Sequence, residues 1–200
     1  RYRCESLGQQ CEFINPGTNK ELCVAMNPND VVSPRISPWN EILSPGYKYT
    51  EANENGFKIL KNDNECLQEY TPVIFGIKTD EPSQCKIDTM HKAKFDEMSD
   101  YFGDSNLYEY NHSMAFNMPS DESLLAQVNE SYWLNQTEIE QIRAIMTNSY
   151  GNLSFFARCK DKKGNWNLNE YAIRACVKPG PDLTPPVIMK ISPDENSYLA

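Results

Sequence analysis

The residues of this sequence that could do chemistry are, first of all, its seven cysteines. They are Cys4, Cys11, Cys23, Cys66, Cys85, Cys159 and Cys176. No two of them form the CxxC or CxxCH motif that is typical of metal, redox and haem sites. In a chain of 200 residues this pattern indicates disulfides, which persist in oxidising compartments outside the cell. We therefore expect an extracellular protein whose cysteines are structural and leave no thiol nucleophile.

Four N-glycosylation sequons point to the same compartment. Their asparagines are Asn111, Asn129, Asn135 and Asn152. One sequon often arises by chance, but four within about 45 residues of a cysteine-rich, acidic chain favour N-linked glycans on a cell-surface protein. The alternative is a surface that is simply rich in asparagine and serine.

Calcium is the best candidate for a bound ion, and we expect no other cofactor. Asp161, Asn165 and Asn167 offer side-chain oxygens at short spacing around one predicted turn. Three further carboxylates could converge at one end of a domain: Asp80, Glu81 and Asp182. The competing interpretation is structural, because Asp-x-x-Gly-Asn is also ordinary hairpin chemistry.

The sequence does not favour an enzyme. Its two histidines are His91, beside lysines, and His112, inside a sequon, and we expect both at the surface. No GxSxG, HExxH, P-loop or GxGxxG motif occurs. A net charge of −9 argues against nucleic acid and anionic membranes as partners. No apolar run approaches the ~20 residues that a membrane-spanning helix needs.

The elements that must position these residues are mostly β-strands. Thr71–Lys78 is the strongest, because its apolar residues alternate and share one face. Phe155–Cys159 and Tyr171–Val177 form a predicted hairpin, followed by a proline-rich exit. Weaker strands are expected at 35–43 with 47–49, at 56–60, at 85–87 after a Glu-Pro-Ser turn, and at 108–116. The sequence thus predicts an all-β domain.

One partly helical insertion interrupts this β pattern at 118–150. A capping box at Thr137–Glu140 precedes apolar residues at helical spacing, namely Ile139, Ile142, Ile145 and Met146. Because sequons lie in or beside it, we expect this insertion on the outside of the domain.

The beginning of the chain resembles the predicted hairpin near its end. Arg3-Cys4-Glu5 matches Arg158-Cys159-Lys160, and the stretch around Cys23 matches the stretch around Cys176 about 150 residues later. Repeats of that size are tandem domains. Residues 1–33 are then the final hairpin of a preceding repeat, 34–178 a whole domain, and 179–200 a linker with the first strand of a following repeat. On this interpretation Cys4, Cys11 and Cys23 have their partners elsewhere; chance similarity is the alternative.

The segment from Thr71 to Pro186 resembles fibronectin-III/Ig-like repeats that occur in tandem in large archaeal cell-surface proteins, of the surface-layer or filament type. The motifs that carry this resemblance are Phe75–Lys86, Phe95–Met98, His112-Ser113, Phe156–Asn165 and the exit Pro181–Pro186. It covers about 115 residues and departs from the family pattern at 118–150. The resemblance implies an Ig-like β-sandwich.

The same resemblance implies a disulfide between Cys85 and Cys159. Cys66 and Cys176 are additions to the family pattern, and by elimination we expect them to pair with each other. Four cysteines allow three pairings, so two others stay open.

These observations favour a non-enzymatic extracellular structural protein. Disulfides brace the domain, and the chain associates with itself or with adjacent repeats of the same chain, in a surface layer or filament. If the chain is one subunit, its incomplete ends could complete a neighbour by strand addition. The alternative is an adhesin that binds a glycan or protein through the 118–150 insertion and loop aromatics. The aromatics concerned are Trp39, Tyr47, Tyr49, Tyr132, Trp133 and Trp166.

Overall fold

The computed structural model describes residues 2–8, 11–25, 27, 29–120, 137 and 152–178. Strands dominate this part of the chain, which confirms the all-β prediction. Its helical elements are the four-residue α1 (Tyr2–Glu5) and two 3-10 turns, η2 (Asn40–Ile42) and η3 (Phe95–Glu97). Within it, no helix is long and apolar enough to cross a membrane. The sequons of Asn129 and Asn135, most of the predicted helical insertion, Asp182 and the exit 179–200 lie outside the described residues.

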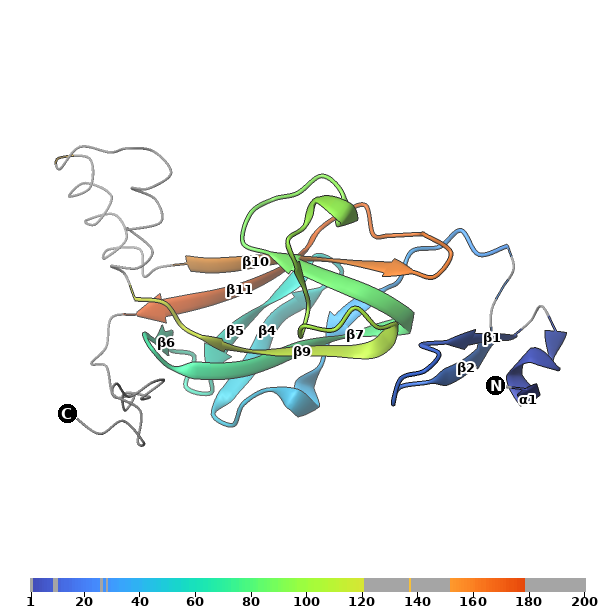
Figure 1. The fold of residues 1–200 in the computed structure, drawn as a ribbon. Coiled ribbons are helices and arrows are strands. Elements are labelled where there is room, and N and C mark those ends of the chain that lie inside the picture. Colours follow the sequence, from blue (N-terminus) through green and yellow to red (C-terminus); the bar gives the residue numbers. More distant parts are fainter. Residues whose placement is uncertain are drawn as a thin grey trace, which may run out of the picture.

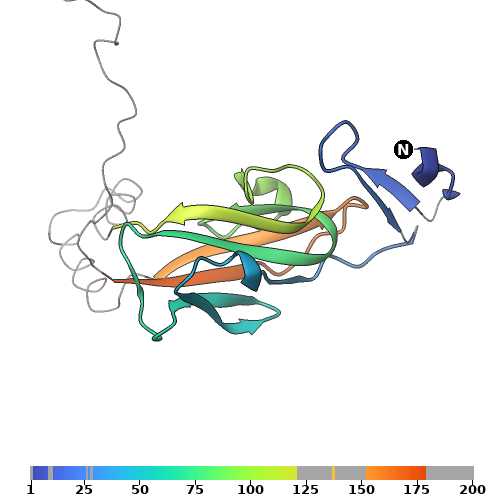
Figure 2. The same ribbon diagram turned by 90° about the horizontal axis from the view of Figure 1, so that it is seen from below.

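One nine-stranded sheet forms the body of the molecule (Figure 1). Its strands are β3 (Ile36–Pro38), β4 (Tyr47–Asn53), β5 (Gly56–Lys61), β6 (Leu67–Gln68), β7 (Pro72–Asp88), β8 (Asp100–Tyr101), β9 (Glu109–Asn117), β10 (Asn152–Asp161) and β11 (Tyr171–Lys178). They follow the order β3-β7-β10-β11-β5-β4, with β6 beside β11 and with β8 and β9 beside β7. The sheet curves around one core and nearly closes on itself (Figures 1 and 2).

The long strand β7 corrects one sequence-based expectation. The sequence predicts two strands separated by a turn at Glu81-Pro82-Ser83, whereas β7 runs without a break for 17 residues. The register of β7 against β9 shifts between Lys78 and Ser83. Pro82 lies within this irregularity, where the ladder does not need its missing N–H, so the strand tolerates the proline.

The core lies on the inner face of this curved sheet. Val73, Phe75 and Ile77 of β7 are fully buried, as their alternation predicts. Phe75 packs against Phe155 of β10, with ring centroids 5.7 Å apart, and against Phe102, at 5.9 Å. Cys85 and Ile87, in the second half of β7, are buried in the same core.

Two disulfides brace the sheet. Cys85 is bonded to Cys159, its register partner on β10, and Cys66 is bonded to Cys176 at the end of β11. These are the two pairs that we expected. They connect positions 74 and 110 residues apart, so the chain-entropy account gives each several kcal/mol of stabilisation.

The N-terminal segment forms a separate two-stranded sheet of β1 (Cys11–Ile14) and β2 (Leu22–Ala25). Cys4 is bonded to Cys23, so the expectation that these two have partners elsewhere is wrong. The segment around Cys4 is the helical turn α1, whereas its match around Cys159 is a strand, and β2 pairs instead with a strand that begins at Cys11. The conformation of a short segment depends on its tertiary contacts. The sequences around Cys4 and Cys159 are similar, but the tertiary contacts of the two segments differ. Cys11 is the one cysteine of the described chain without a disulfide.

Candidate functional site

Three carboxylates from distant parts of the chain meet where the N-terminal segment joins the body of the molecule. Asp30 lies in the connection before β3, Glu81 in the middle of β7, and Asp161 at the end of β10. Each offers an oxygen atom, and the three atoms lie within 4.8 Å of one another. We call these three residues the carboxylate cluster.

The β10–β11 turn fixes the position of Asp161, which is 2% exposed. Its carboxylate accepts hydrogen bonds from the backbone N–H of Asn165 at 2.8 Å and from the Asn165 side-chain amide at 2.7 Å. The same amide also donates to the backbone oxygen of Asp30 at 3.1 Å. Asn165 therefore directs its N–H groups toward the cluster, and its side chain connects the β10–β11 turn to the segment that contains Asp30.

Asn167 does not join this cluster. Its side-chain oxygen accepts a hydrogen bond from the Cys159 N–H at 2.6 Å, and its amide donates to the Asn169 carbonyl at 2.6 Å. Both ends of the side chain thus serve the backbone. Of the predicted calcium ligands, the structure brings Asp161 and Glu81 together and adds Asp30, which the sequence did not indicate.

The electrostatics of the cluster show most clearly at Glu81. Partial burial, followed by the negative charges of Asp161, Asp30 and Asp80, raises the pKa of Glu81 to about 7. Asp80 itself accepts a hydrogen bond from the Arg35 N–H at 2.8 Å. A cation or a proton relieves the repulsion among these groups, and carboxylate oxygens are ligands that calcium prefers.

A second set of contacts docks the β1–β2 hairpin onto the body of the molecule. Asn15 is buried, has a φ of 52°, and closes a two-way hydrogen-bond pair with Tyr108. Its side-chain oxygen accepts from the Tyr108 N–H at 2.9 Å, and its amide donates to the Tyr108 carbonyl at 2.8 Å. Asn tolerates this backbone conformation better than most residues. The side chain thus imitates a strand pair between segments 93 residues apart.

Two ion pairs flank this docking contact. Lys20 of the hairpin lies 2.5 Å from the Glu109 carboxylate, and Lys162 of the β10–β11 turn lies 2.5 Å from the Glu12 carboxylate. Each pair joins the N-terminal segment to the body. No sequence motif indicates these pairings, because each depends on how two distant turns meet.

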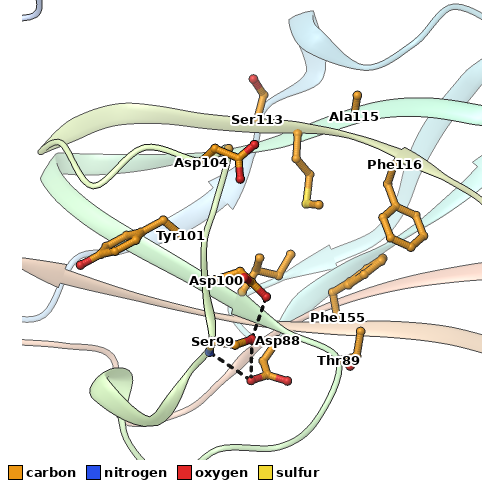
Figure 3. Close-up of a pocket in the computed structure, with 13 residues that line it drawn as sticks. Asp88, Thr89, Ser99, Asp100, Tyr101, Asp104, Ser113, Ala115, Phe116 and Phe155 are labelled. Carbon is orange, nitrogen blue, oxygen red and sulfur yellow. Dashed lines mark hydrogen bonds between the residues drawn. The ribbon is translucent and has the colours of Figure 1, made fainter. Parts of the chain in front are cut away.

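The structure also contains a cavity of about 450 Å³ beside β7, β8 and β9 (Figure 3). Aspartates and aromatic rings line it together, and no lysine or arginine is among the described residues that do so. Asp88 accepts hydrogen bonds from the N–H and hydroxyl of Ser99, and the same hydroxyl lies 2.7 Å from Asp100. Phe116 and Phe155 line another side, with centroids 4.8 Å apart. Acidic acceptors beside apolar rings suit a ligand that has both hydroxyl groups and apolar faces.

The loop aromatics of the predicted adhesin site are placed differently. Trp39, Tyr47, Tyr49 and Trp166 are half-buried. Tyr49 packs on Phe57 with centroids 4.4 Å apart, and Trp166 lies under the guanidinium of Arg158, at 5.2 Å. Tyr132 and Trp133 lie outside the described residues.

The histidines and the remaining sequons are divided between surface and interior. His91 is exposed and lies 2.6 Å from Glu170, whereas His112 is 2% exposed, so the expected surface position of His112 is wrong. Alternation along β9 turns His112 inward, and burial lowers its pKa. Its neighbour Asn111 is exposed, and Asn152 begins β10. Glycosylation at these asparagines stays a prediction.

Comparisons of this chain with protein-family models, with curated proteins and with solved structures gave no match.

Proposed function

We propose that this chain is a non-enzymatic, extracellular structural protein that builds a surface layer or filament. It would do so as a glycosylated, disulfide-braced Ig-like module that associates with itself or with adjacent repeats of the same chain. This proposal draws on the resemblance of the chain to tandem repeats of archaeal cell-surface proteins. Three disulfides within one chain fit an oxidising, extracellular-type environment.

The observation that carries the proposal is the built junction between the N-terminal segment and the body. A preceding segment is held at one end of the module by the Asn15–Tyr108 hydrogen bonds and by ion pairs on either side of them. Such a junction sets the angle at which one unit follows another. A chain of units that must bear load needs such a fixed angle.

Calcium has a defined place in this proposal. The carboxylate cluster of Asp30, Glu81 and Asp161 lies at the junction, and an ion there would neutralise the repulsion and stiffen the connection. Removal of calcium with a chelator is then expected to lower the melting temperature of the full chain, and Glu81→Gln to reduce that response. An equal response in the Glu81→Gln variant would exclude this site.

The assembly of the purified chain is the direct test. Sedimentation velocity and electron microscopy over a range of concentrations should show ordered self-association of the unaltered chain. Specific, saturable binding of a glycan or protein by a chain that stays monomeric would overturn the structural role.

That outcome would favour the second candidate, a glycan-binding module, for which the cavity of Figure 3 is the specific observation. In that case Asp100→Asn should abolish signals on a glycan array, because it removes a charged acceptor from the cavity lining. Glu97→Gln, at an exposed position outside the cavity lining, is the matched control and should bind as the unaltered chain does.

A further inference from the structure

The cavity beside β7, β8 and β9 has walls of two kinds. Asp88, Asp100 and Asp104 lie on one side of it, and the rings of Phe116 and Phe155 lie on the other (Figure 3). Its volume of about 450 Å³ falls in the range of small-molecule sites, about 300–1,000 Å³. The walls therefore combine negative charge with apolar surface around a space in which a small molecule fits.

The acidic wall is held firmly in place. Phe102 is fully buried in the core, and its N–H donates to the Cys85 carbonyl at 2.9 Å. Gly103 passes so close to β9 that a Cβ atom there would lie 2.3 Å from the Ser113 carbonyl oxygen. Asp104 follows with a φ of 56°, a conformation that aspartate tolerates better than most residues. The core contact and the close approach to β9 thus position this wall before any ligand binds.

The three carboxylates lack a positively charged partner. None of them forms an ion pair with another described residue. Asp88 accepts hydrogen bonds from the N–H groups of Met90 and Ser99. In contrast, one oxygen of Asp100 and both oxygens of Asp104 have no donor in the described part of the chain. Like charges around one cavity repel one another, and a cation bound among them relieves that repulsion.

An organic cation suits this arrangement better than a metal ion. Within the described residues, only the carboxylate cluster brings three acidic side chains close enough to share one metal ion. The oxygens of Asp88, Asp100 and Asp104 do not come together in that way. An ammonium group on a larger frame reaches separated carboxylates with several N–H groups, and aromatic rings attract it through cation–π interactions.

Hydroxyl groups complete the lining of the cavity. Thr89, Ser99 and Ser113 contribute to it, and their hydroxyls can both donate and accept hydrogen bonds. A neutral sugar would leave the carboxylate charges without compensation, and a lysine side chain brings a charge but no hydroxyls. A sugar with a free amine has hydroxyls, an apolar ring face and a positive charge, which together match all three kinds of lining group.

We propose that this cavity binds an unacetylated amino sugar, with its ammonium group against Asp100 and Asp104 and its ring against Phe116. The inference rests on the second candidate function, the glycan-binding module, and names its class of ligand. It does not depend on whether the chain assembles into a layer or filament.

The test is a titration of the full 15N-labelled chain with D-glucosamine, followed by NMR in mildly acidic buffer, where the amine is protonated. Chemical shift changes should centre on residues 99–104 and 113–116. N-acetyl-D-glucosamine and D-glucose lack the charge and should bind at least about tenfold more weakly. Asp104→Asn keeps a residue that tolerates the positive φ, and it should weaken glucosamine binding about tenfold. Glu97→Gln, outside the cavity lining, is the matched control and should bind as the unaltered chain does.

The outcomes separate this inference from the functions on which the chain could rely. Equal binding of the three sugars overturns the inference but leaves a module that binds neutral glycans. Binding of Nα-acetyl-lysinamide as tight as that of glucosamine also overturns it, in favour of a lysine side chain of a protein partner. Unchanged shifts in the cavity, or unchanged affinity in Asp104→Asn, overturn it as well. Sedimentation velocity on the same samples tests the assembly of the chain independently.

Discussion

Replacing Glu81 by glutamine removes one charge from the carboxylate cluster while keeping the shape of the side chain. The other two carboxylates, of Asp30 and Asp161, stay in place. Since the surroundings of Glu81 raise its pKa from 4.5 to about 7, the ionised side chain is less favourable in the folded protein than in the unfolded chain. The variant should therefore be more stable than the unaltered protein at alkaline pH without calcium.

The magnitude and the pH window follow from the same shift. A raised pKa means that the folded protein holds a proton between pH 4.5 and 7 that the unfolded chain releases. The contribution of Glu81 to the stability of the folded protein is fully present below pH 4.5 and is lost as the pH rises through 7. The full shift corresponds to about 3.4 kcal/mol at 1.36 kcal/mol per pH unit. Because Glu81 is partly exposed to water, which screens the repulsion, we expect about 1–2 kcal/mol in practice.

Scanning calorimetry from pH 4 to pH 8.5 in chelating buffer measures this difference. For a chain of this length, about 1–2 kcal/mol is a rise of roughly 2–8 °C in melting temperature, seen at pH 8 and absent at pH 4. Glu97→Gln, at an exposed position, is the matched control and should change little at either pH. A Glu81→Gln variant that melts as the unaltered protein does across the whole range would refute the repulsion on which the reasoning depends.

Three further predictions concern stability. Replacing both Cys85 and Cys159 by alanine should lower the free energy of unfolding by about 2–5 kcal/mol in urea titrations; a smaller loss would mean that the pairing of β7 with β10 holds without the bond. Tyr49→Phe should lower the free energy of unfolding by about 1–3 kcal/mol, because the Tyr49 hydroxyl forms hydrogen bonds with both the N–H and the carbonyl of Gly76. Tyr171→Phe should lower it by less than about 0.5 kcal/mol, because the Tyr171 hydroxyl has no hydrogen-bond partner among the described residues. Equal losses in the two variants would contradict these hydrogen bonds. Asn15→Ala should release the hairpin, seen as faster hydrogen exchange in β1 and β2 with the body unchanged; exchange that stays slow in the hairpin would show that other contacts hold it.

Most strands were predictable because their signals are local. Alternation at Val73, Phe75 and Ile77 indicates a half-buried strand wherever it occurs, and the structure buries all three. The β10–β11 hairpin follows in the same way from two apolar runs on either side of a turn with Gly164 at a φ of 93°. The residues that define such an element are neighbours in the sequence, so their pattern can be recognised without knowledge of the tertiary structure.

The missed elements are those that depend on a partner. β6 and β8 are two residues each and exist only because β11 and β7 lie beside them. The continuation of β7 through Pro82 likewise depends on a shifted register against β9, which no local pattern encodes. Short strands have too little intrinsic preference to be recognised without their neighbours.

The candidate calcium site shows the same division. The sequence alone placed Asp161 and Asn165 in one turn, because both the turn chemistry and the ligand chemistry are local. Only the tertiary structure brought Glu81 and Asp30 to that turn, and it gave Asn167 to the backbone of β10 instead.

The sequence by itself determined the all-β class, the structural use of cysteine and the position of most strands, since each depends on composition or on neighbours in the chain. The tertiary structure decided which cysteine bonds which in the N-terminal segment, the burial of His112 and the carboxylate cluster. Each of these arises where segments tens of residues apart meet in space, and the free energy of that meeting is shared among many contacts that no single stretch of sequence contains.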